Sequence, residues 1–77
     1  MRTIEIEVSA DPSVLDAVFS PMVIESRSAP PGGKVTVTLD RPRSRIVLSM
    51  EAEELSVLRA MLNSYSGLMS AALRTAG

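Results

Sequence analysis

The chain has 77 residues, a net charge of −1 and 45% hydrophobic residues, with no cysteine and no histidine. The two missing residue types exclude disulfides, thiol nucleophiles and the usual zinc sites, and they remove the commonest general base. This length predicts a single domain over residues 1–77, close to the lower size limit for a self-sufficient core.

The N-terminal part predicts a strand followed by a short helix. Residues 3–9 alternate strictly between polar and apolar side chains, as in a half-buried strand. They contain no apolar run like that of a signal peptide, which favours a cytoplasmic location. Asp11 and Pro12 then predict a helix start, with a capping carboxylate and proline at the first helical position. We expect this helix to end near Ser20, because Pro21 follows.

The middle of the chain predicts a hairpin. Residues 22–33 are expected to form a loop that ends in two prolines and two glycines, and we interpret those glycines as a tight turn. Residues 34–40 and 45–50 alternate like the first strand, and the turn over residues 41–44 joins them.

The hairpin tip is basic. Residues 27–47 carry five basic residues against Asp40 alone, and Arg41, Arg43 and Arg45 lie in or beside the turn. These three arginines are candidates for contact with RNA phosphates, where each would add a salt-dependent contribution to binding. A solubilising turn is the alternative. No aromatic side chain accompanies the arginines, so readout of bases by stacking is not supported.

Residues 51–74 predict one long helix. The segment has no proline, a single glycine and many strong helix formers. Glu51, Glu53 and Glu54 are expected in its first turn and Arg74 in its last, where each charge complements the helix dipole.

The long helix has more apolar surface than one small sheet usually covers. Leu55, Leu58, Leu62, Tyr65, Met69 and Ala72 form an apolar seam at helical spacing. Val57, Met61 and Leu68 widen this seam. The remaining arc is nearly all small, and Arg59 is the only charge between Leu55 and Leu73. We therefore expect a protein partner on this helix, with a tightly packed core helix as the alternative. The polar residues along it argue against a membrane span.

The element order predicts an α+β fold of the type β-α-β-β-α. The third strand can pair antiparallel between the other two strands, and both helices then cover one face of a three-stranded sheet. Two strand edges remain open, and open edges invite strand addition. Because the chain is also near the minimum size for a core, we expect a homodimer.

No set of residues predicts catalysis. Glu51, Glu53 and Glu54 could be imagined as acid, base or metal ligands, but carboxylates before a helix are far more often solvated charges that complement its dipole. The many serines have no histidine beside them. The sequence predicts a protein that is not an enzyme and that uses no metal or cofactor.

One segment resembles a known family. The strand end and helix LSMEAEELSVLRAMLNSY, and above all Leu58-Arg59-Ala60 and Leu62-Asn63-Ser64-Tyr65, resemble the Pcc-type small subunit of the KEOPS complex. The human CTAG/LAGE antigens are similar to that family. The resemblance covers essentially the whole chain, in element order and in length. The paired Glu53-Glu54 and the few cations near the C-terminal end depart from the family pattern.

The resemblance implies a non-catalytic scaffold in a complex that attaches a threonylcarbamoyl group to an adenosine beside the anticodon of certain tRNAs. It implies a homodimer in which each copy binds the catalytic ATPase-fold subunit through its helices, with tRNA held by the assembled complex and no contact with a membrane. The predicted protein interface comprises Leu55, Ser56, Arg59, Asn63, Ser64, Ser66 and Ser70.

Two other classes compete with this interpretation. A KH-like RNA-binding module shares the element order, but it needs a GxxG loop between two helices, and the chain has no such motif. A small-ligand-binding dimerisation domain would instead have a pocket at its dimer interface, which the sequence leaves open.

Overall fold

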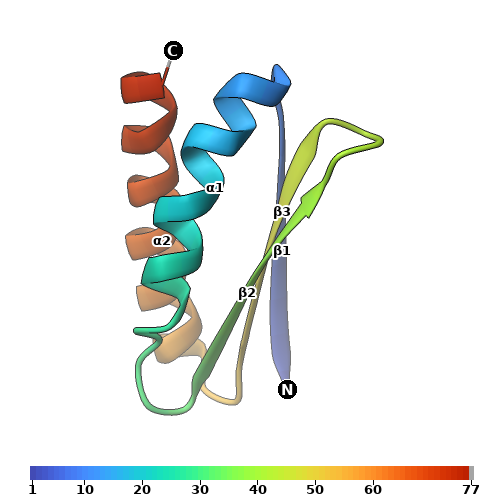
Figure 1. The fold of residues 1–77 in the computed structure, drawn as a ribbon. Coiled ribbons are helices and arrows are strands. Elements are labelled where there is room, and N and C mark those ends of the chain that lie inside the picture. Colours follow the sequence, from blue (N-terminus) through green and yellow to red (C-terminus); the bar gives the residue numbers. More distant parts are fainter. Residues whose placement is uncertain (77) are drawn as a thin grey trace.

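The computed structural model describes residues 1–76, and its elements follow the predicted order (Figure 1). Strands β1 (Arg2–Ser9), β2 (Gly33–Asp40) and β3 (Arg45–Ala52) form one sheet, and helices α1 (Pro12–Ser26) and α2 (Leu55–Ala76) lie together on one of its faces. The strand order is β1-β3-β2, and both pairings are antiparallel. The predicted α+β class is confirmed, with the third strand in the middle of the sheet.

The core lies between β3 and the two helices. Strand β3 has a neighbour on each side and helices over one face, so its alternate side chains Ile46, Leu48, Met50 and Ala52 are buried. The helices contribute the other buried side chains, which are Leu15, Val18, Met22, Leu58, Met61, Tyr65 and Met69. Four of these core residues are methionines, whose flexible side chains fill the irregular space that a chain with only two aromatic residues leaves.

The opposite face of the sheet is polar, as the alternation predicts. Its exposed side chains are Thr3, Glu5, Glu7, Thr36 and Thr38. Val47 and Ser49, in the middle strand, are half-buried between them. This face can therefore remain in water without covering.

Helix α1 is longer than the sequence predicts. It continues through Pro21 to Ser26, so the first part of the expected loop is helical. Proline at this position removes one intrahelical hydrogen bond. The next residue, Met22, is fully buried against the sheet, and this burial offsets the loss. Pro12 occupies the first turn as predicted, but the Asp11 side chain makes no capping hydrogen bond.

Helix α2 begins later than predicted, because β3 continues to Ala52. Arg2 and Gly33 flank Ala52 on the two neighbouring strands, so sheet pairing claims this segment before the helix starts. Glu51 therefore lies in the strand, and no acidic residue lies in the first turn of α2. Arg74 does lie in the last turn, as expected. Neither α1 nor α2 is long and apolar enough to cross a membrane.

The turns around the hairpin use two residues with positive φ. Gly32 has φ of 83°, in the left-handed region that favours glycine, and it leads into β2. Ser44 has φ of 49° and closes the turn between β2 and β3. The Ser44 carbonyl accepts a hydrogen bond from the amide of Ala10, which ties the hairpin to the end of β1.

Candidate protein interface

The outward arc of α2 carries nearly all of the predicted interface residues. Ser56, Arg59, Asn63, Ser64 and Ser70 are exposed. Leu55 is also exposed, at 41% of its surface, although it was expected in the apolar seam. Ser66 is half-buried, and its hydroxyl donates to the Leu62 carbonyl of the same helix.

Arg59 is the central charge on this arc. Over the described residues 1–76, none of the ion pairs includes Arg59. Its neighbours on the arc are small or uncharged, so a helix from another protein could approach α2 closely there.

Less of the apolar surface of α2 is exposed to water than the sequence predicts. Met61 is fully buried, and Val57 and Leu68 are half-buried. The sequence argument counted only the sheet as a cover, whereas α1 lies beside α2 in the same layer (Figure 1). Contact between the two helices therefore covers part of the extra apolar surface of α2, and no partner protein is needed for that part.

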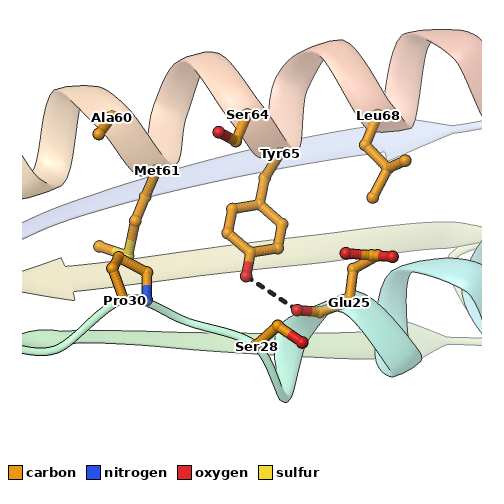
Figure 2. Close-up of a pocket in the computed structure, with 8 residues that line it drawn as sticks. All are labelled: Glu25, Ser28, Pro30, Ala60, Met61, Ser64, Tyr65 and Leu68. Carbon is orange, nitrogen blue, oxygen red and sulfur yellow. Dashed lines mark hydrogen bonds between the residues drawn. The ribbon is translucent and has the colours of Figure 1, made fainter.

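A hollow opens between the C-terminal end of α1 and the middle of α2. It has a volume of about 340 Å³ and is lined by Glu25, Ser28, Pro30, Ala60, Met61, Ser64, Tyr65 and Leu68. Figure 2 shows the Tyr65 ring reaching from α2 towards α1. Its hydroxyl donates a 2.9 Å hydrogen bond to the Glu25 carbonyl. Burial raises the pKa of Tyr65, and the nearby Glu25 carboxylate adds to the effect, so this hydroxyl remains a donor at neutral pH.

A second hollow, of about 430 Å³, follows along the same line between the helices. Its lining is Ala17, Pro21, Ala71, Ala72, Thr75 and Ala76, and every one of these side chains is small or a proline. We call the two hollows together the inter-helix groove. Ile24, which is 61% exposed, lies on α1 between Pro21 and Glu25, the residues that this helix contributes to the two hollows.

Sequence reasoning did not find the groove. Of the seven predicted interface residues, only Ser64 lines it, because the prediction treated α2 alone. The missing wall comes from Glu25 and Ser28, in the segment expected to be loop, and from Pro21 directly before it. A helical reading through Pro21 would have revealed it, since Leu15, Val18 and Met22 keep helical spacing across that proline.

The three arginines of the hairpin each have an acidic partner within the chain. Arg41 lies 3.0 Å from Asp16 of α1, and Arg43 lies 3.4 Å from Asp40. Arg45 lies 3.0 Å from both Glu7 and Asp40. Arg41 and Arg43 keep 68% and 72% of their side chains exposed, whereas Arg45 keeps only 26%.

Arg45 holds the three strands together on the polar face. It bridges Glu7 on β1 and Asp40 on β2. The hydrogen bond that the Arg45 guanidinium donates to the Asp40 carboxylate raises the pKa of Arg45, which therefore stays charged. Partial desolvation would favour the neutral Asp40 carboxyl, but hydrogen bonds from Arg45 and Arg43 outweigh it and lower the pKa of Asp40. Arg45 is thus committed to the sheet, which leaves Arg41 and Arg43 more available to a nucleic acid.

A comparison with models of protein families gives a match. A family model described as "Transcription factor Pcc1" matches residues 2–77, essentially the whole chain. No curated protein matches the chain.

Proposed function

This chain belongs to the Pcc1 family, and from that membership we propose that it is a non-catalytic scaffold subunit of the KEOPS complex. In this role it binds the catalytic ATPase-fold subunit through its helix layer, pairs with a second copy of itself, and supports tRNA threonylcarbamoyl-adenosine modification in the cytoplasm. The observation that carries the proposal is the scarcity of charge on α2. Arg59 and Arg74 are the only charged residues of this helix, although one side of it is exposed.

The inter-helix groove and the outward arc together suit a helical partner. Ala17, Ala60, Ser64 and Ala71 are exposed and small, and small side chains allow helix axes to approach to about 8 Å. Glu25 is the one charged residue that lines the groove, so a partner helix with a lysine or arginine at the matching position would fit it best.

Direct nucleic-acid binding by this chain alone is a weaker candidate, although the family description names a transcription factor. The polar face of the sheet carries Glu5, Glu7, Asp40 and Glu51 against Lys34 and Arg45. This acidic balance repels a phosphate backbone. The KH-like alternative meets a second difficulty, because β2 and β3 separate the two helices and no short loop joins them.

The direct test of the proposal is capture of the catalytic subunit. We expect Arg59→Glu to weaken this binding several-fold or more, because a reversed charge buried in the contact costs multiple kcal/mol. Calorimetry with the purified catalytic subunit, without tRNA, measures the effect. Arg43→Glu is the matched control, since it makes the same reversal on the hairpin and should bind normally. Unchanged binding by folded Arg59→Glu would count against the outward arc as an interface.

A second expected result concerns tRNA. The double variant Arg41→Ala, Arg43→Ala should bind tRNA less tightly in the assembled complex, with the slope of log K against log salt reduced by up to about two units. It should change little in the isolated subunit. Arg2→Ala, at the other end of the sheet, serves as the control. If the salt dependence of the whole complex stays the same, these arginines only solubilise the turn.

A further inference from the structure

The α1 wall of the inter-helix groove carries two hydrogen-bond acceptors that the chain itself does not use. Resting on the proposed function, we infer that a helix of the catalytic subunit lies along this groove and donates to both, the backbone carbonyl of Ala17 and the carboxylate of Glu25. A neutral donor, such as a serine or asparagine side chain, meets the carbonyl. A lysine or arginine of the same partner helix meets the carboxylate.

Pro21 leaves the backbone carbonyl of Ala17 without its usual partner. In an α-helix this carbonyl accepts a hydrogen bond from the backbone N–H four residues later. Here that residue is Pro21, which has no N–H to donate, although α1 stays helical through it. Within the described residues 1–76, none of the side-chain hydrogen bonds reaches Ala17. The carbonyl is therefore available to a donor from outside the chain.

This carbonyl opens onto the second hollow of the groove. Ala17 and Pro21 both line that hollow and both are exposed, and a helical carbonyl points along the axis from the first towards the second. Thr75 lines the same hollow, but its hydroxyl already donates a 3.0 Å hydrogen bond to the Ala71 carbonyl. Water can reach the Ala17 carbonyl in the free chain. A partner that covers it must supply a donor, because a buried acceptor without a hydrogen bond is costly.

Glu25 carries a negative charge that α1 does not balance. It lies in the last turn of this helix, at the negative end of the helix dipole, and that turn has no basic residue. None of the ion pairs found in the described part of the chain includes Glu25. The hydrogen bond from Tyr65 goes to the Glu25 backbone carbonyl, and Figure 2 shows the carboxylate turned away from it. A partner cation in the first hollow would offset both the carboxylate and the dipole.

The two acceptors lie along one side of α1. Ala17, Pro21 and Glu25 follow one another at intervals of four residues, which places them on neighbouring turns of the same helix side. With a rise of about 1.5 Å per residue, the acceptors are roughly 6–12 Å apart along the axis. A partner helix that runs beside α1 therefore carries its neutral donor and its cation about four to eight residues apart. This spacing is the feature that identifies the partner helix.

Pro21→Val tests the carbonyl, because valine restores the backbone N–H and is close to proline in size. The Ala17 carbonyl is then satisfied within α1, and the donor of the partner loses its acceptor. We expect binding of the purified catalytic subunit to weaken about tenfold in calorimetry. The melting temperature of the variant should rise, since a helix-interior proline is removed. Pro12→Val is the matched control, because a proline in the first turn costs no hydrogen bond.

Glu25→Gln tests the carboxylate, because it keeps the shape of the side chain and removes its charge. We expect about tenfold weaker binding of the catalytic subunit, with a smaller dependence of the affinity on salt. The melting temperature should not fall, since the negative charge opposes the dipole of α1. Glu5→Gln makes the same change at an exposed position on the polar face of the sheet and should bind normally.

Weaker binding together with an equal or higher melting temperature is the result that supports the inference, because loss of structure would lower both. Normal binding by either Pro21→Val or Glu25→Gln would overturn it, while the proposed function would stand as long as the unmodified chain binds. If the unmodified chain does not bind the catalytic subunit at all, the proposed function itself fails, which is a different result in the same titration.

Discussion

Ser64→Trp is expected to weaken binding of the catalytic subunit by at least about 30-fold, the effect of losing roughly 2 kcal/mol at an interface hot spot. Ser64 is exposed and lines the hollow between α1 and α2. An indole ring at this position would occupy the space that a partner helix needs. The fold should be unaffected, because the side chain does not contribute to the core.

Two controls make this result specific. Ser64→Ala should bind normally, since it keeps the hollow open, and Thr3→Trp places the same ring on the exposed polar face of the sheet. Calorimetry reports the affinities, and circular dichroism verifies the fold. If Ser64→Trp binds normally while Arg59→Glu does not, the partner lies on the outward arc of α2 and leaves the inter-helix groove empty.

The sheet could be predicted because alternation is a strong local signal. In β3, Ile46, Leu48 and Met50 alternate with polar or half-buried residues, and the same pattern recurs in the other two strands. Three strands and two helices in this order can be arranged in only a few topologies. The middle position of the third strand follows from hairpin pairing and from the crossover that the first helix makes.

The element ends could not be predicted, because tertiary contacts decide them. Pro21 is a local signal for the end of a helix, yet burial of Met22 keeps α1 helical to Ser26. Glu51 suits a first helical turn, yet pairing on both sides keeps it in β3. In each case a local preference, of about 3 kcal/mol for the proline and of about 1 kcal/mol or less for the glutamate, competes with packing that only the folded chain reveals.

Only part of the candidate site could be predicted, because the rest of it also depends on tertiary contacts. The scarcity of charge on α2 is visible in the sequence, and it correctly marks exposed positions such as Arg59 and Asn63. The inter-helix groove forms only where α1 and α2 pack side by side, and no local sequence pattern predicts which faces of the two helices are in contact. The ion pairs of Arg41 with Asp16 and of Arg45 with Glu7 also join residues far apart in the chain, so these acidic partners could not be assigned from spacing.

Leu48→Ala is expected to lower the free energy of unfolding by about 2–5 kcal/mol, the usual cost of a large-to-small change in a core. Leu48 is fully buried in the central strand and pairs with Ile6 and Val37 on its two neighbours. A chain of this length is expected to have a total stability of only about 4–12 kcal/mol. Val47→Ala, one residue away on the polar face, should cost clearly less.

The same variant tests whether the fold depends on a second copy. If the folded state is a homodimer, mass action raises its apparent stability with protein concentration. The melting temperature of Leu48→Ala should then increase measurably between micromolar and hundred-micromolar samples, and a weakened core makes the transition easy to reach. A variant with an unshifted melting temperature over that range would show that one chain folds alone, and the proposed dimer would then not be part of its stability.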